Sequence, residues 1–234
     1  MLLATFMYIV CAVAQAILAV IAIRLYMKDR AIGTLMLVLP IAAVVWDNTI
    51  VALGATIGEG SLLMALSWPR YIGHALFTPA WIVAGVSFAQ RSGAQWLNTK
   101  AVNVGQWVLY AVCVVLGFLR SVVFLNMELV AEGGLLYYRN ASGFPGPPFG
   151  SVIMLFVVLA CAVIVWRKIK SPWMFLGSLF MLISVGVPAA VIGFDLTNLG
   201  EVVMAASLVY TGYVLLRQKG QPKKQLKAAP PGGK

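Results

Sequence analysis

The stretch that decides the fold is residues 2–25, LLATFMYIVCAVAQAILAVIAIRL, which carries no charge before Arg24. It is long enough to cross a bilayer, because a hydrocarbon core of about 30 Å needs roughly 20 apolar residues in a helix. It has no basic leader and no small-residue cleavage site, so we expect a first membrane span rather than a cleaved signal peptide. Later apolar runs are continuous rather than alternating, which favours helices over a closed barrel. The sequence therefore predicts an all-α, polytopic membrane helix bundle.

Composition points to the same class of protein. Of the 234 residues, 62% are hydrophobic and 10% are charged. Soluble domains carry about 25% charged residues, so this chain has too few to cover a surface that faces water. Membrane lipids are therefore the expected partners. Cys11, Cys113 and Cys161 each fall inside an expected span, where a thiol behaves as a small apolar group, so we expect no disulfide, metal site or cofactor.

The apolar runs divide the chain into seven expected spans. A bundle of residues 1–217 would be followed by a basic, disordered cytoplasmic tail at 218–234. The connection at about 125–149 is rich in Gly and Pro and is expected to be an exposed loop. Pro40, Pro79 and Pro188 fall within spans, where proline kinks a helix. The spans are approximately 3–25, 32–56, 70–90, 104–125, 150–167, 173–193 and 197–216.

Charge predicts the orientation of the bundle. All of the 17 lysines and arginines lie on one side of these spans except Arg70, Arg120 and Arg139. Because basic residues near helix ends remain cytoplasmic, we expect the N-terminus outside and the C-terminus in the cytoplasm. The net charge of +10 follows from this asymmetry, and we expect no nucleic-acid partner.

Ionisable residues within the spans predict a polar pocket in the outer half. Asp47 lies in the second span and Glu201 in the seventh, and a carboxylate inside a bilayer is costly unless it is paired, protonated or wet. Arg70, His74 and Thr78 follow at i, i+4 and i+8, so they share one face of the third span. The predicted substrate-binding residues are Trp46, Asn48, Glu59, Arg70, Thr78 and Arg120, with Phe77, Trp81 and Tyr210 as further walls. Glu59 would share a face with Asn48 only if the second helix continues that far.

Acid/base chemistry is one interpretation of this pocket. A carboxylic acid in an apolar site can stay protonated near neutral pH and donate its proton to a lipid-soluble substrate. Asp47 would be the acid, and Glu201 or His74 would be the base or would stabilise a cation. A structural alternative stays open, in which Asp47 pairs with Arg70 or Arg120 only to fix helix packing.

Two of these acids carry a resemblance to a known family. Trp46-Asp47 in the second span and Glu201 in the seventh resemble the pattern of the compact seven-helix membrane terpene cyclases of meroterpenoid biosynthesis. Those enzymes have a similar length and carry one essential acid after a Trp in the second helix and another in the seventh. This chain has Asp where the family has Glu, and no longer motif is shared. The resemblance implies protonation-initiated cyclisation of an isoprenoid.

Two other classes of function also fit seven spans with buried acids. Asp, His and Glu inside a membrane relay protons in transporters, so a proton-coupled carrier is an alternative. A non-catalytic sensor or scaffold is another. Retinal-type photochemistry is disfavoured because the interiors of the expected spans contain no lysine for a Schiff base.

Overall fold

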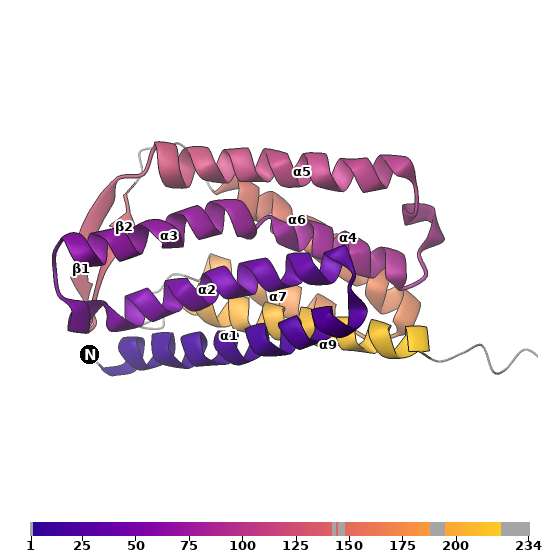
Figure 1. The fold of residues 1–234 in the computed structure, drawn as a ribbon, viewed down its shortest axis with the longest axis horizontal. Helices are drawn as coiled ribbons and strands as arrows, with labels where there is room; N and C mark the ends of the chain where they lie inside the picture. Colours follow the sequence, from indigo (N-terminus) through magenta and orange to yellow (C-terminus); the bar gives the residue numbers. More distant parts are fainter. Residues whose placement is uncertain (1, 142–143, 145–147, 188–194, 221–234) are drawn as a thin grey trace, which may run out of the picture.

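The computed structural model describes residues 2–141, 144, 148–187 and 195–220 as a bundle of helices aligned along one long axis (Figure 1). Six of its helices are long and apolar enough to cross a membrane, with α3 and α4 together forming one of them. This confirms the predicted all-α bundle and is typical of a multi-pass membrane protein. The helices are α1 (Leu2–Asp29), α2 (Ile32–Ile57), α3 (Ser61–Phe77), α4 (Ala80–Arg91), α5 (Lys100–Phe118), α6 (Phe149–Ile169), α7 (Trp173–Gly186) and α9 (Leu196–Gly220).

The third span differs from the prediction. It begins at Ser61 rather than near residue 70, and it is interrupted between Phe77 and Ala80. Pro79 lies in this interruption, where its missing N–H and its ring prevent a continuous helix. Pro69 is tolerated inside α3 and Pro40 inside α2, whereas Pro188 lies outside the described residues. The break follows His74, the last polar residue of α3, and Thr78 lies within it.

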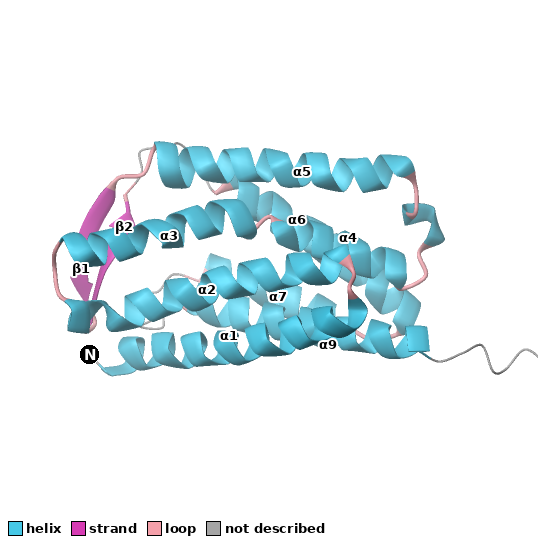
Figure 2. Cartoon of the chain, in the orientation of Figure 1, coloured by secondary structure: helices cyan, strands magenta, loops and turns pink. Residues whose placement is uncertain are grey.

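The expected loop at 125–149 contains a β-hairpin, which is a correction to the sequence interpretation (Figure 2). Strands β1 (Met127–Glu132) and β2 (Leu135–Asn140) pair antiparallel around Gly133 and Gly134, whose φ angles are 60° and 86°. A two-residue turn with positive φ at both positions is the type I′ geometry that glycine favours. The Gly133-Gly134 pair between two β-prone runs is the sequence feature from which this hairpin could have been predicted.

The hairpin packs on the bundle instead of projecting freely. Tyr138 is buried beside Ile50 of α2 and Leu63 of α3. Gly54 of α2 allows this contact, because a Cβ there would overlap the carbonyl oxygen of Leu136. The hairpin therefore forms a cap over one end of α2 and α3.

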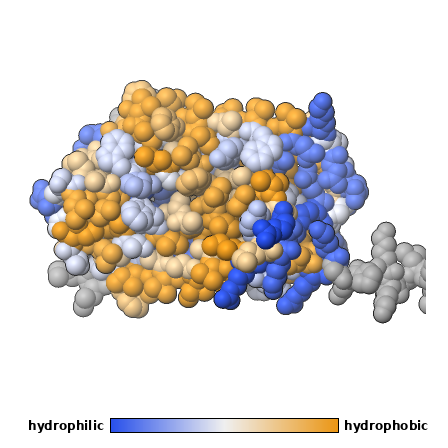
Figure 3. All heavy atoms as spheres, viewed as in Figure 1, coloured by the Kyte–Doolittle hydropathy of each residue, from blue (hydrophilic) through white to orange (hydrophobic). Residues whose placement is uncertain are grey.

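The two ends of the bundle differ in character. On the face shown in Figure 3, apolar residues cover most of the middle, and hydrophilic residues gather at the end where α9 finishes. At that end Arg91 of α4 pairs with Asp29 at 2.8 Å, and Thr34 donates a hydrogen bond to the same carboxylate at 2.6 Å. These contacts join the α1–α2 connection to the end of α4. The hairpin lies at the opposite end (Figure 1).

We predict that Gly54→Ala destabilises the protein by about 1–3 kcal/mol, because the added methyl group must displace the hairpin backbone. Thermal unfolding of the purified protein in nanodiscs measures the change. The matched control is Gly105→Ala in α5, where an added Cβ meets nothing within 4 Å. The control should melt at or slightly above the wild-type temperature, since Ala is the better helix former. Equal melting of both variants would contradict the close contact between α2 and β2.

Candidate functional site

A buried ion pair joins α2, α3 and the hairpin. Arg70 Nε lies 2.6 Å from Asp47 Oδ1, and the two side chains are 8% and 12% exposed. Arg70 also donates from Nη1 to the carbonyl oxygen of Tyr138 at 3.1 Å, and the Tyr71 hydroxyl donates to the same oxygen at 2.6 Å. The ion-pair alternative for Asp47 is therefore realised with Arg70. The backbone of β2 accepts a further hydrogen bond from the Arg70 guanidinium group.

His74 lies one helical turn beyond Arg70 and faces the same carboxylate. Its Nε2 is 3.7 Å from Asp47 Oδ2, and its Nδ1 is 3.2 Å from Thr78 Oγ1. Asp47 of α2 therefore orients Nε2, and Thr78, four residues further along the chain, orients Nδ1. A carboxylate beside one nitrogen stabilises the imidazolium form and fixes the orientation of the ring.

A cavity of about 260 Å³ opens beside His74, between α2, α3, α4, α6, α7 and α9. Its polar lining comes from His74, Thr78, Ser151, Thr197 and Glu201. The rest of the described wall is apolar, with Trp81 as its one aromatic ring apart from the His74 imidazole. This apolar part consists of Val44, Trp81, Pro148, Val152, Met154, Leu155, Met181, Val185 and Met204.

Glu201 and Asp47 have different environments. The Asp47 carboxylate is held by Arg70 and is not part of the cavity wall. The Glu201 carboxyl group lines the cavity, and within the described residues no hydrogen bond or ion pair is formed to it. The structure thus brings Asp47, Arg70, His74 and Thr78 together and places Glu201 on the wall of the cavity that His74 and Thr78 also line.

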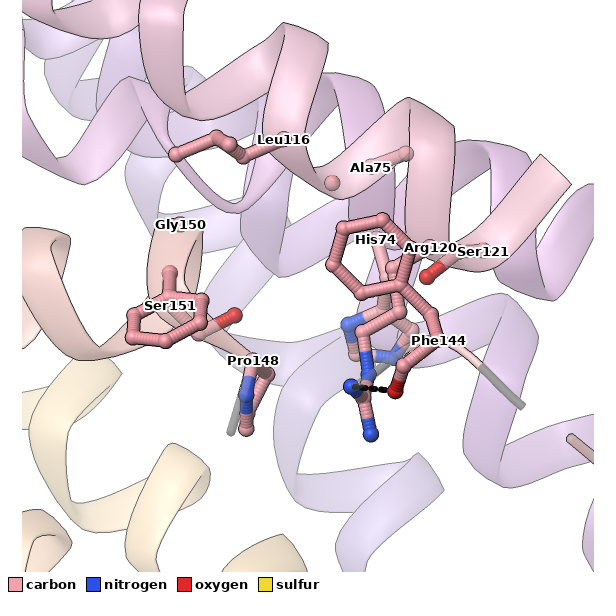
Figure 4. Close-up of a pocket in the computed structure, with 11 residues that line it drawn as sticks. His74, Ala75, Leu116, Arg120, Ser121, Phe144, Pro148, Gly150 and Ser151 are labelled. Carbon is pink, nitrogen blue, oxygen red and sulfur yellow. Dashed lines mark hydrogen bonds between the residues drawn. The ribbon is translucent and has the colours of Figure 1, made fainter. Parts of the chain in front are cut away.

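A smaller pocket of about 50 Å³ adjoins the cavity and shares His74, Pro148 and Ser151 with it. Arg120 reaches this pocket from a π-helical turn, Leu119–Val123, that follows α5. Figure 4 shows His74, Arg120 and Phe144 on one side and Pro148, Gly150 and Ser151 on the other. Ser121 and Ser151 are polar wall residues that the sequence interpretation missed, because isolated serines in apolar helices carry no distinctive pattern.

Several predicted pocket residues lie elsewhere. Trp46 is 40% exposed, and its indole N–H donates to the carbonyl oxygen of Leu66. Asn48 is buried and donates to the carbonyl oxygen of Val44 on its own helix. Because α2 ends at Ile57, Glu59 lies beyond the helix, is exposed and does not share a face with Asn48.

The predicted aromatic walls are corrected in the same way. Trp81 lines the cavity, but Phe77 is not among its described lining residues. Tyr210 is 50% exposed and packs edge-on against Trp173, with 6.4 Å between the ring centroids. The reason is the rotation of each helix about its own axis. The position of a residue along a span does not reveal whether its side chain faces a neighbouring helix or lipid.

Comparison of the chain with protein-family models and with curated proteins finds no match. Function therefore has to be inferred from the chemistry of the side chains, which differs among proteins that share a fold. The groups available for chemistry are two titratable side chains, Glu201 and His74, on the wall of one mostly apolar cavity.

We predict that Asp47→Asn and Arg70→Met each destabilise the protein by about 3–5 kcal/mol, because each leaves one buried charge without its partner. The double variant should lose less than the sum of the two single losses. Chemical or thermal unfolding in nanodiscs provides the three values. As a control, Glu128→Gln removes the exposed partner of Arg139, at 3.7 Å, and should change stability by less than about 1 kcal/mol. Additive losses in the double variant would show that the ion pair contributes no coupling.

Proposed function

We propose that this protein is an integral membrane enzyme that performs acid/base chemistry on a lipid-soluble substrate held in the cavity. The observation that carries the proposal is that Glu201 and His74 line a single cavity whose other walls are mostly apolar. Ligand sites in proteins have this composition, with a mostly apolar wall and a few placed polar groups. An apolar cavity inside a bundle of apolar helices suits a substrate that arrives from the bilayer.

Glu201 is the proposed proton donor. None of the described residues forms an ion pair or hydrogen bond with its carboxyl group, and an ionised carboxylate is costly in an apolar site, so the group is expected to be neutral there. Its proton then faces the substrate. This assignment differs from the sequence hypothesis, which gave the acid role to Asp47. Asp47 is already bound to Arg70 at 2.6 Å, and a carboxylate held by a guanidinium is a poor proton donor.

His74 is the proposed proton acceptor, and Asp47 is its positioning residue. The Asp47 carboxylate, 3.7 Å from Nε2, stabilises the imidazolium that forms when His74 accepts a proton. One proton enters the substrate from Glu201 and one leaves to His74, so the product is an isomer of the substrate. A proton returned from His74 to Glu201 restores the starting state.

Cyclisation of an isoprenoid is the most specific reaction of this type, and the resemblance of Trp46-Asp47 and Glu201 to membrane terpene cyclases suggested it. Acid-initiated cyclisation generates a carbocation, which aromatic faces stabilise. Trp81 supplies one such face, and the sulfurs of Met154 and Met204 are polarisable neighbours in the same wall. The aromatic support is smaller than the sequence predicted.

The orientation belongs to the same proposal. We place the hairpin end outside and the α9 end in the cytoplasm, because the last turn of α9 carries Arg217 and Lys219 and this helix finishes at the hydrophilic end of the molecule (Figures 1 and 3). Helix α1 begins and α9 finishes at opposite ends of the bundle, as an odd number of crossings requires. The cavity then lies in the outer half of the membrane.

The buried face of α2 supports an enzyme more than a proton-coupled carrier. Between Thr34, near the Asp29–Arg91 pair, and Asp47, the buried residues of this helix are Leu37, Pro40, Ile41 and Val44. A carrier requires polar groups that continue across the membrane. Along α2 the polar groups fall into two separate clusters with apolar packing between them.

We predict that Glu201→Gln lowers product formation by about 10²–10⁴-fold, because the amide keeps the shape of the side chain but cannot donate a carboxyl proton. The protein would be expressed in a host supplied with polyprenyl alcohols and their epoxides, and isomeric products would be separated by liquid chromatography and detected by mass spectrometry. Glu59→Gln is the control, since this exposed side chain lies beyond the end of α2. An active Glu201→Gln enzyme would refute the role of Glu201. Absence of any isomer from correctly inserted wild type would count against the enzyme for those substrates and direct attention to proton flux in liposomes.

A further inference from the structure

The smaller pocket adjoins the cavity and has a different chemistry. Both spaces contact His74, Pro148 and Ser151, so they lie side by side. The large cavity is mostly apolar, whereas the small pocket brings Arg120 and two serine hydroxyls, Ser121 and Ser151, to one place. A ligand that fills both must have an apolar body and a polar end.

The backbone around Arg120 is built to place its side chain in this pocket. Arg120 lies in a π-helical turn, a feature that often occurs at functional sites because it redirects side chains. Asn140 at the end of β2 donates to the Arg120 carbonyl oxygen at 3.3 Å, and Arg120 donates to the Phe144 carbonyl oxygen at 3.4 Å. In Figure 4 the guanidinium lies beside His74 and below the Phe144 ring. The hairpin thus holds the turn, and the turn directs Arg120 inward.

Close helix contacts give the small pocket its walls. A Cβ at Gly150 would meet the Cys113 carbonyl oxygen at 2.7 Å, and one at Gly117 would meet the Ala75 backbone at 3.2 Å. These glycines bring α3, α5 and α6 together around the pocket. The first turn of α6 lies in the wall, and its N-cap residue, Pro148, makes no side-chain cap, so the turn adds a weakly positive field.

Size limits what the polar end can be. At roughly 30 Å³ for each water-sized group, 50 Å³ holds about one or two such groups and 260 Å³ holds about eight or nine. A hydroxyl or a carbonyl group fits the small pocket, and a carboxylate can place one of its oxygens there. A diphosphate, with two phosphorus and seven oxygen atoms, does not.

We propose that the small pocket binds the oxygen-bearing head group of an amphipathic lipid whose apolar body of about two isoprene units lies in the large cavity. The inference rests on the proposed function and deepens it by naming the substrate class. Arg120 donates hydrogen bonds to the head-group oxygen, with Ser121 and Ser151 on the adjacent walls. Binding the head group there positions the apolar body between His74 and Glu201.

Three probes that differ only in the head group test this assignment. Geranic acid, geraniol and 2,6-dimethylocta-2,6-diene share one carbon skeleton and carry a carboxylate, a hydroxyl and no oxygen. Saturable binding of each to the full chain in nanodiscs is measured by equilibrium dialysis, with empty nanodiscs as the blank. The acid should bind about tenfold or more tightly than the hydrocarbon, with the alcohol between them, as expected for hydrogen bonds to a charged donor.

Variants then test the role of Arg120. Arg120→Met should remove the difference between the three probes, and Arg120→Lys should retain part of it through its charge. Arg139→Met is the control, since Arg139 is an exposed arginine of the hairpin and should leave all three affinities unchanged. If Arg120→Met does not fold, the wild-type ranking still tests the head-group site, and Arg120→Lys tests the role of Arg120, since an unchanged ranking in that variant would overturn it.

The outcomes separate this inference from the proposed function. Equal wild-type affinity for the three probes would overturn the head-group site and leave the lipid cavity and its acid/base chemistry in place. The wild-type ranking in a folded Arg120→Met variant would overturn the assignment to Arg120. Absence of saturable binding by every probe would overturn the cavity as a lipid site, and the proposed function would fall with it.

Discussion

The site depends on the ion pair between Asp47 and Arg70, because one carboxylate organises three separate parts of the chain. Asp47 fixes α2 against α3 through Arg70, it orients His74, and Arg70 in turn binds the Tyr138 carbonyl oxygen of the hairpin. Two charges in a low-dielectric interior attract strongly, but their desolvation is costly, so such a pair persists only when further hydrogen bonds satisfy it. Tyr138 supplies that bond from a strand 68 residues away in sequence. The hairpin is therefore part of the site even though none of its described residues lines the cavity.

The same hairpin acts at a second point. Its last residue, Asn140, binds the carbonyl oxygen of Arg120, so one β-strand supports both Arg70 and Arg120. Gly54 on α2 lets this strand approach the bundle closely. A change in strand register would disturb both arginines at once, because successive residues of a strand alternate between its faces. The ion pair and the proposed head-group site thus both depend on the position of β2.

The helical part of this architecture could be predicted from the sequence, and the contents of the site only partly. Continuous apolar runs such as 2–25 indicate helices because lipid offers the backbone N–H and C=O groups no hydrogen-bond partner, so they must bond to one another within the helix. The stripe of Arg70, His74 and Thr78 was predictable because a helix repeats every 3.6 residues. The hairpin was missed because Gly and Pro suggested a loop, and the pairing of its strands is set by packing on Ile50 and Leu63. Trp46 and Tyr210 are not among the described residues that line the cavity, because the rotation of each helix about its axis depends on all its neighbours together.

The two acids show why environment rather than residue type assigns a chemical role. From the sequence, Asp47 and Glu201 are both carboxyl groups within spans and could exchange roles. In the structure Asp47 has a guanidinium at 2.6 Å, which keeps it anionic and makes it a partner for a cation. Glu201 faces an otherwise largely apolar wall and forms no ion pair within 4 Å with the described residues. A pair of acids in contrasting surroundings, one stabilised as the anion and one disfavoured as the anion, is the arrangement that lets a protein hold one proton ready and receive another. His74 lies between these two environments, in contact with the first and on the wall of the second, so a proton accepted from the substrate generates a cation next to the carboxylate already placed to stabilise it.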